Sequence, residues 1–242
     1  MNLSERDKAM TLQKHQPAFI QRLQFQRSGS LSYIGHLDLM RTFEHALRRA
    51  ELPILHSQGY NPRPMLVFAL PLGVGISTEA DYMDVSFSEE IATDIVIAAL
   101  NANLPENLKI LDGWPVPESA GSIMALVSAA SYRLKAKGIT PAVKALMKRE
   151  SVMAEKKSKG QLRTIDIRPL ILEVRESVPD DADEITVFVL AGSHENLRPD
   201  LLLNSLSVYE GYPERDGLNC EVIRTGLFTG VYPDIRTLKE SL

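Results

Sequence analysis

The hydrophobic period changes within the first folded segment of the chain, and this change constrains the fold more than any other feature. Residues 20–27 alternate, with Leu23 and Phe25 predicted to face inward and Arg27 on the same side, which is the pattern of a strand. From His36 the apolar residues Leu37, Met40, Phe43, Leu47 and Ala50 recur at helical spacing. This pattern ends before Pro53, so we expect a strand followed directly by a helix.

The segments that follow complete a recognisable order of elements. Strands are expected at 66–70, 82–87 and 108–116, and a helix is expected at 91–104. The Pro71–Gly75 segment between the first two of these strands is interpreted as a hairpin connection, because its G-x-G lacks the third glycine and the following helix of a phosphate loop. The order strand, helix, strand, strand, helix, strand is the split βαβ pattern of a ferredoxin-like sandwich.

The second half of the chain is expected to repeat this order. Its expected elements are a strand at 127–137, a helix at 141–150, extended segments at 152–155 and 161–174, a strand at 185–191, a helix at 199–206 and a strand at 221–228. We therefore predict an α+β fold with two ferredoxin-like (βαββαβ) halves in tandem. The predicted units are a disordered N-terminal tail at 1–18, a first half with the site at 19–118, a second half at 123–232 and a C-terminal tail at 233–242.

Composition excludes several classes of protein. With 242 residues, 44% hydrophobic and 24% charged, the chain has the composition of an ordinary globular protein. The net charge of -4 means that binding to nucleic acid would need a local basic patch. The single cysteine, Cys220, excludes an internal disulfide, an iron–sulfur cluster and a thiolate zinc site in this chain. We expect a cytoplasmic protein without a membrane span.

Polar residues gather where the first helix begins. His36 could donate a hydrogen bond to a phosphate or transfer a proton, and the free amides of a helix start attract anions. His36 and Asp38 are the catalytic candidates, although each also has an ordinary role in capping or supporting a helix. Arg41 lies nearest this end on a basic helix face that is otherwise interpreted as solvated.

A second polar segment follows the helix at 57–64. It reads Ser57-Gln58-Gly59-Tyr60-Asn61-Pro62-Arg63-Pro64. Two prolines flank Arg63 and hold it in extended geometry, and Gly59 allows a positive φ. Rigid presentation of hydrogen-bonding groups suits a nucleobase, a peptide or a phosphate, and the alternative is a well-packed turn. We predict that this segment and the helix start meet in one polar recess that binds substrate through His36, Arg41, Ser57, Gln58, Gly59, Tyr60, Asn61 and Arg63.

Acidic and basic clusters elsewhere are weaker signals. The unevenly spaced Glu79, Asp81 and Asp84 favour an exposed edge over a Mg²⁺ site, and no metal site is predicted. Basic residues occur at alternate positions of one expected strand and in a Lys-rich hairpin; the predicted nucleic-acid contacts are Arg133, Lys135, Lys137, Lys156, Lys157 and Lys159. A solvated surface is the alternative interpretation for both groups.

Several motifs resemble one bacterial family. They are Gly35-His36-Leu37-Asp38-Leu39-Met40-Arg41, Ala46-Leu47-Arg48-Arg49-Ala50, Leu52-Pro53, Ser57 to Pro64, Pro71-Leu72-Gly73, Asp166-Ile167-Arg168-Pro169 and Arg224-Thr225-Gly226-Leu227. From Arg22 to Phe228 the chain resembles the radical-SAM-linked protein family, a domain of unknown function. Its members are encoded beside, or fused behind, a radical S-adenosylmethionine protein that often has a cobalamin-type domain. They also neighbour genes for an E/G-type ribonuclease and for ribosomal proteins. The chain departs from the family at Gly35, where Ser is more frequent, and at Arg63, where His is frequent, so a metal site at position 63 is not expected.

The resemblance implies a partner role rather than a known reaction. We expect a non-catalytic accessory protein that binds or presents an RNA or ribosome-related substrate to a radical S-adenosylmethionine protein. No cofactor is expected in this chain, and S-adenosylmethionine and an iron–sulfur cluster are expected on the partner. One alternative is an RNA-processing or transferase enzyme with His36 as acid/base and Asp38 orienting it. A purely structural subunit interface is a third.

Overall fold

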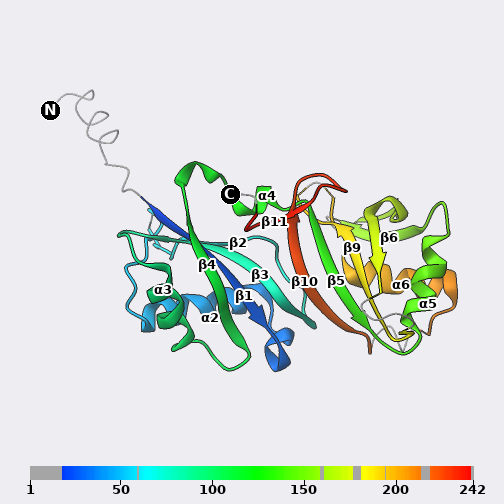
Figure 1. Cartoon of the computed structure of the whole chain (residues 1–242), viewed down its shortest axis with the longest axis horizontal. Coiled ribbons are helices and arrows are strands. Elements are labelled where there is room, and N and C mark those ends of the chain that lie inside the picture. Colours follow the sequence, from blue (N-terminus) through cyan, green and yellow to red (C-terminus); the bar gives the residue numbers. More distant parts are fainter. Residues whose placement is uncertain are drawn as a thin grey trace.

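A computed structural model describes residues 18–58, 60–158, 161–176, 181–193, 195–213 and 219–240. The fold is α+β, as predicted, with a large and mostly antiparallel sheet and few helices. Within the described residues this sheet has nine strands, and its main path follows the order β4-β1-β3-β10-β5-β9-β8 (Figure 1). Residues 1–17 of the predicted N-terminal tail lie outside the described residues. No helix in the described ranges is both long and apolar enough to cross a membrane.

The first half contains four strands and two α-helices in its described residues. Its elements are β1 (Phe19–Arg27), the 3-10 helix η1 (Gly29–Tyr33), α2 (His36–Arg49), β2 (Leu66–Phe68), β3 (Ile76–Phe87), α3 (Thr93–Asn101) and β4 (Leu108–Val116). β4 pairs with β1, β1 with β3, and β3 with β2, and all three pairings are antiparallel. The hairpin connection predicted at Pro71–Gly75 is confirmed, because it lies between the paired strands β2 and β3. β3 begins at Ile76, well before the predicted start at Tyr82.

The second half contains seven strands and three α-helices in its described residues. Its elements are η2 (Glu118–Ala120), α4 (Ile123–Leu126), β5 (Ala129–Lys135), α5 (Ile139–Met147), β6 (Met153–Ser158), β7 (Gln161–Asp166), η3 (Arg168–Leu170), β8 (Ile171–Arg175), β9 (Glu184–Leu190), α6 (Pro199–Glu210), β10 (Glu221–Thr229) and β11 (Arg236–Thr237). β10 pairs with β5, β5 with β9, and β9 with β8, again antiparallel. β6 and β7 pair only with each other among the described strands and form a separate two-stranded sheet. β11 falls in the segment expected as a C-terminal tail; it pairs with β10, and Leu238 after it is fully buried.

The two halves share the large sheet through one parallel contact. β3 of the first half pairs with β10 of the second between Ile76–Thr78 and Val222–Arg224. We call this contact the seam. One apolar core lies wholly in the first half, and the other joins the buried residues of the second half to Ala69, Tyr82, Trp114 and Val116 of the first. The seam is where residues far apart in sequence come together.

Helix α2 packs on the first half with most of the predicted stripe, because Phe43 and Leu47 are buried and Met40 is partly buried against the same core. Leu39, Phe43 and Leu47 are buried, whereas Leu37 is 60% exposed. The ring of Phe43 lies 5.2 Å from that of Phe25 on β1, in an edge-to-face contact. A pattern with spacings of three and four fits neighbouring stripes of a helix almost equally well, so sequence placed Leu37 on the wrong face.

Candidate functional site

Helix α2 begins without a side-chain cap. Its N-cap residue is Gly35, with φ -70° and ψ 164°, and no side-chain hydrogen bond caps the helix start. The amides of Asp38 and Leu39 donate to the Gly35 carbonyl at 3.1 and 3.0 Å. Those of His36 and Leu37 donate no hydrogen bond within the described part of the chain. Such free amides give a helix start partial positive charge.

His36 is half-buried at this helix start. Its ring lies 5.3 Å from the ring of Phe68 on β2, in an edge-to-face contact. Burial lowers the pKa of His36 below its usual 6.5, and the nearby Arg27 lowers this pKa further, while Asp81 opposes both. The imidazole is therefore neutral at pH 7.

Asp38 does not orient His36. Its Oδ1 accepts a hydrogen bond from Nη1 of Arg41 at 3.1 Å, and both of these side chains are more than 60% exposed. No hydrogen bond joins Asp38 to His36 among the described contacts. The expected pair of an acid/base histidine and an orienting carboxylate is thus not formed. The carboxylate of Asp38 is paired instead with Arg41, three residues further along the helix.

The segment at 57–64 is a loop fixed at its base and exposed at its tip. The Ser57 amide donates to the Arg63 carbonyl at 2.8 Å, and the Arg63 amide donates to the Ser57 hydroxyl at 3.1 Å. Tyr60 is fully exposed. Gln58, Asn61 and Arg63 are exposed as well. Gly59 lies outside the described residues.

No described contact joins this loop to the start of α2. His36 packs on Phe68, the last residue of β2, whereas the loop ends at Pro64, before β2 begins at Leu66. In the described ranges, no hydrogen bond or ion pair connects the loop to His36 or Arg41. The described contacts therefore do not join the two polar features, and the shared recess stays a prediction.

A buried charged cluster at the seam was missed by sequence reasoning. Arg27, Asp81 and Arg224 are each at most 2% exposed. Nη2 of Arg224 donates to both carboxylate oxygens of Asp81 and, at 2.9 Å, to the Leu70 carbonyl. The Thr78 hydroxyl donates to the Arg224 carbonyl at 3.2 Å across the same seam. The cluster therefore ties the first half to the second.

The prediction of an exposed acidic edge at 79–84 is wrong for its aspartates. Asp81 is buried against Arg224, and Asp84 accepts two hydrogen bonds from Arg22 at 2.8 and 2.9 Å. Both faces of this part of the sheet are covered, so alternate residues of β3 are buried on either side. Burial of a carboxylate requires a paired cation, and this explains why two arginines are buried with them.

The electrostatics of the cluster follow from its burial. Burial raises the pKa of Asp81, and the attraction of Arg224 opposes that rise. For Arg224, burial favours the neutral form, but Asp81 and then Tyr132 outweigh it and raise its pKa. Arg27 has a lowered pKa because of burial, which Asp81 only partly offsets. All of these guanidinium groups remain charged at neutral pH.

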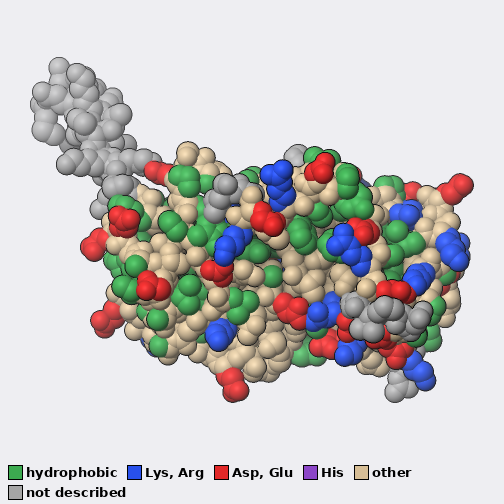
Figure 2. Space-filling view, viewed as in Figure 1, with side chains coloured by type: hydrophobic (Ala, Val, Ile, Leu, Met, Phe, Trp, Pro, Cys, Tyr) green, Lys and Arg blue, Asp and Glu red, His purple; other side chains and the backbone are tan. Residues whose placement is uncertain are grey.

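The predicted nucleic-acid contacts differ in how far their charge is already neutralised. Arg133 forms an ion pair with Glu79 and lies 4.0 Å from Glu184, which also lies 4.0 Å from Lys135. Lys137 is exposed and has no carboxylate partner in the described part of the chain. Figure 2 shows positive and negative side chains interspersed over the face that it presents.

The hairpin of β6 and β7 is more basic. Lys156 stands opposite Arg163 in its register, and Nζ of Lys156 donates to the Asn196 carbonyl at 3.2 Å. Among described residues, neither cation has a carboxylate partner. Lys159 lies outside the described residues, and the backbone of Lys157 belongs to β6.

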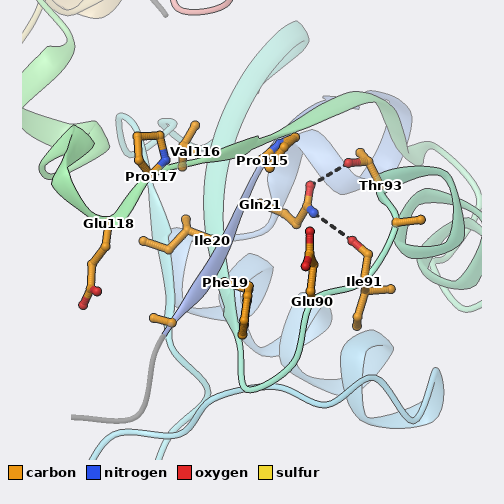
Figure 3. A pocket seen from close by; sticks show the side chains of 12 residues that line it. Phe19, Ile20, Gln21, Glu90, Ile91, Thr93, Pro115, Val116, Pro117 and Glu118 are labelled. Atoms are coloured by element: carbon orange, nitrogen blue, oxygen red, sulfur yellow. Dashed lines mark hydrogen bonds between the residues drawn. The ribbon is translucent and has the colours of Figure 1, made fainter.

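A cavity of about 550 Å³ lies at the other end of β1 from the seam. Figure 3 shows Gln21 held there by two hydrogen bonds: its amide nitrogen donates to the Ile91 carbonyl at 3.0 Å, and its amide oxygen accepts from the Thr93 hydroxyl at 2.8 Å. Apolar residues and the carboxylates Glu90 and Glu118 complete the wall. None of the predicted site residues lines this cavity. The one signal for it in the sequence was a polar residue, Gln21, which the alternation of residues 20–27 places on the inward side of the strand.

Comparison with known proteins identifies one family. A family model described as "Uncharacterized protein conserved in bacteria (DUF2344)" matches residues 21–199. This match covers the first half, the seam strand β3 and the second half as far as the start of α6. No curated protein matches the chain.

Proposed function

The chain belongs to the DUF2344 family, and from that premise we propose that it is a non-catalytic partner of a radical S-adenosylmethionine enzyme. In this role it binds or presents an RNA or ribosome-related substrate to the enzyme in the cytoplasm. The resemblance to the radical-SAM-linked family supports the choice of enzyme class. The observation that carries the proposal is the 57–64 loop, whose base is fixed and whose tip is exposed.

The loop has the properties of a docking element. The Leu55 amide donates to the Ser86 carbonyl at 2.9 Å, and the Ser86 amide donates to the Met65 carbonyl at 3.0 Å, so both ends of the loop are tied to β3. Tyr60 and Arg63 are presented from this fixed base. Tyr and Arg are enriched among the residues that contribute most to protein–protein binding, and a loop that is ordered before binding loses less entropy on association.

A recognition role fits the described contacts better than catalysis does. The alternative enzyme uses His36 as acid/base, and the neutral, half-buried imidazole favours it, since a neutral ring accepts a proton. Asp38, however, is paired with Arg41 rather than with His36. An RNA-processing or transferase activity of the purified chain that is lost in His36→Ala would favour this alternative.

The substrate is proposed to bind to the basic hairpin of β6 and β7 rather than to strand β5. Arg133 and Lys135 on β5 already have carboxylate neighbours, which reduce their attraction for phosphate. Lys156 and Arg163 have none in the described part of the chain, and like charges directly opposite on a hairpin are destabilising until an anion lies between them.

We also propose that each half is a ferredoxin-like unit. In both halves the fourth strand pairs with the first, the first with the third and the third with the second, all antiparallel. An α-helix follows the first and the third strand of each half. This connectivity supports the split βαβ arrangement, and the β6–β7 hairpin is then an insertion in the second unit.

Co-purification tests the proposal. The full chain would be co-expressed with the radical S-adenosylmethionine protein encoded beside it, and Tyr60→Ala and Arg63→Ala would be compared with the wild type. Val208→Ala and Arg198→Ala are matched controls, because these residues are exposed on or beside α6. We expect the loop variants alone to lose the partner. Equal retention by all variants, or failure of the wild type to retain it, would rule the proposal out.

A further inference from the structure

A second cavity, of about 280 Å³, lies beside the β6–β7 hairpin in the second half of the chain. The hairpin, η3 and a segment between β9 and α6 form its walls. Its lining includes two cations, two carboxylates and an apolar part, which are Lys156 and Arg163, Asp166 and Glu195, and Ile165 and Leu170. Charges of both signs and apolar surface therefore meet in one cavity.

The two cations line the cavity from facing positions of the hairpin. Lys156 on β6 stands opposite Arg163 on β7 in the register of the two strands. Nζ of Lys156 donates to the Asn196 carbonyl at 3.2 Å, and this neutral acceptor leaves the ammonium charge uncompensated. Among the described residues, neither cation has a carboxylate within ion-pair distance, although two carboxylates line the same cavity. The cations and the carboxylates therefore occupy separate parts of the wall.

One of the two carboxylates is held in a fixed position. Oδ1 of Asp166 accepts hydrogen bonds from the amides of Val152 and Arg168 at 2.8 and 3.0 Å. These two bonds, that of Val152 first, lower the pKa of Asp166, so this carboxyl group is ionised at neutral pH. Glu195 is exposed, and its side chain makes no hydrogen bond or ion pair among the described contacts.

The carboxylates distinguish between the ligands that this cavity could take. A site for phosphate alone would be weakened by two carboxylates in its wall, because like charges repel. A ligand that fits all of the wall offers an anionic group to the cations, hydrogen-bond donors to the carboxylates and a flat apolar face to the rest. A nucleotide whose base carries an amino group has these three properties.

We propose that this cavity binds one nucleotide of the RNA substrate, with its phosphate between Lys156 and Arg163. The exocyclic amino group of its base then faces Asp166 and Glu195. Carboxylates accept hydrogen bonds from the amino group of cytosine. Uracil has a carbonyl oxygen at the same ring position, which a carboxylate repels, so the cavity prefers cytidine to uridine.

This inference deepens the proposed function, since it names the part of the substrate that the hairpin holds. It rests on that function only for the choice of RNA, because a free mononucleotide shares the same binding chemistry. Binding of the nucleotide is a property of this chain alone. Its failure would leave docking by the 57–64 loop untouched, and failure of docking would leave the nucleotide site untouched.

The test compares short single-stranded oligocytidine with oligouridine of equal length. The two share their backbone and differ at the base in the amino group or carbonyl oxygen that would face the carboxylates. The affinity of the full chain for each labelled oligonucleotide would be measured by fluorescence anisotropy. We expect the wild type to bind oligocytidine about tenfold more tightly than oligouridine.

Substitution of the carboxylates separates recognition of the base from binding of the phosphate. Glu195→Gln changes an exposed side chain, and Asp166→Asn keeps an oxygen that accepts from the amides of Val152 and Arg168. We expect each change to reduce the preference for oligocytidine, and the double variant to bind the two oligonucleotides within about twofold of each other. Binding of oligouridine should be retained or become tighter in these variants, because negative charge has been removed.

Substitution of a cation should have the opposite pattern. We expect Lys156→Ala to weaken both oligonucleotides about equally, to keep the preference, and to lower the salt dependence of log affinity by about 0.7. Lys137→Ala is the matched control, because Lys137 is an exposed lysine that does not line this cavity. It should leave both affinities within about twofold of the wild type.

Equal affinity of the wild type for the two oligonucleotides would overturn the inference and leave the hairpin as a contact for the RNA backbone. An unchanged preference in Glu195→Gln and in the double variant would overturn it as well. Cytidine monophosphate and uridine monophosphate give the second arm. If cytidine monophosphate binds more tightly than uridine monophosphate while neither oligonucleotide binds, the site is assigned to a free nucleotide. If none of these probes binds, the cavity is not a nucleotide site.

Discussion

Two arginines of the first half, Arg27 and Arg63, show how differently one residue type is used in this protein. Arg27 is fully buried at the seam and donates to three carbonyls. Arg63 is exposed in a loop, where only its backbone is fixed. A buried charge of this kind stabilises one arrangement of the chain only while its partners remain, whereas an exposed one is available to a ligand. The polar residues of this half therefore divide into those that hold the fold together and those that are exposed to partners.

The largest expected effect comes from removing the carboxylate at the seam. Asp81→Asn keeps the shape of the side chain but leaves Arg224 buried without a counter-charge, so we expect the free energy of unfolding to fall by about 3–5 kcal/mol. Urea denaturation followed by circular dichroism measures it. Glu79→Gln is the control, because Glu79 is half-exposed beside Arg133, and its effect should stay below about 1 kcal/mol. Equal losses for the two variants would contradict the distinction between buried and exposed charge.

Arg22→Met should have a smaller effect of the same kind. It removes both hydrogen bonds to Asp84, whose side chain is 12% exposed. Because Asp84 keeps some contact with water, we expect a loss of about 2–3 kcal/mol. The same denaturation experiment measures this loss. A loss larger than that of Asp81→Asn would show that the buried pair at the seam does not contribute more to stability than the Arg22–Asp84 pair.

His36 should make stability depend on pH. Its pKa is depressed in the folded state, so below pH 6.5 the unfolded chain binds more protons than the folded one, and acidification from pH 7 destabilises the fold. We expect the free energy of unfolding of His36→Gln to depend less on pH than that of the wild type. The two slopes should differ by about 0.5 kcal/mol per pH unit, because solvent screens this half-exposed site. Denaturation curves between pH 7.5 and about pH 5.5 measure it. His45→Gln, on the exposed face of the same helix, is the control, and parallel curves for wild type and His36→Gln would contradict the assignment.

The smallest effect on stability is expected in the loop. Tyr60→Ala and Arg63→Ala remove exposed side chains that make no described side-chain contacts, so each should change the free energy of unfolding by less than about 0.5 kcal/mol. Thermal and urea denaturation check this. A loss of several kcal/mol in either variant would place the loop among the structural features and would remove the basis for treating it as a docking element.

Local patterns predicted the elements because their causes are local. Alternation identified β1, and helical spacing together with Pro53 identified α2, because the backbone period and the chain breaker are both read from neighbouring residues. Leu37 was placed on the wrong face, because a pattern of this length does not fix the rotation of a helix. The tip of the 57–64 loop was correctly expected to present its polar side chains.

The seam could not be predicted, because its partners are far apart in sequence. Asp81 and Arg224 are separated by 143 positions, and nothing local indicates that β3 pairs in parallel with β10. One signal was available: alternation placed Arg27 on the inward side of its strand. An inward arginine requires buried acceptors and a counter-charge, which would have directed attention to Asp81 as a buried residue rather than an exposed one.

The affinity of the full chain for its radical S-adenosylmethionine partner, measured by calorimetry for Tyr60→Ala and for His36→Gln, tests most directly whether the loop and the helix start have separate roles. We predict that Tyr60→Ala weakens binding about tenfold or more, while His36→Gln stays within about twofold of the wild type. Equal weakening by both variants, or weakening by His36→Gln alone, would contradict separate roles for the docking loop and the helix start.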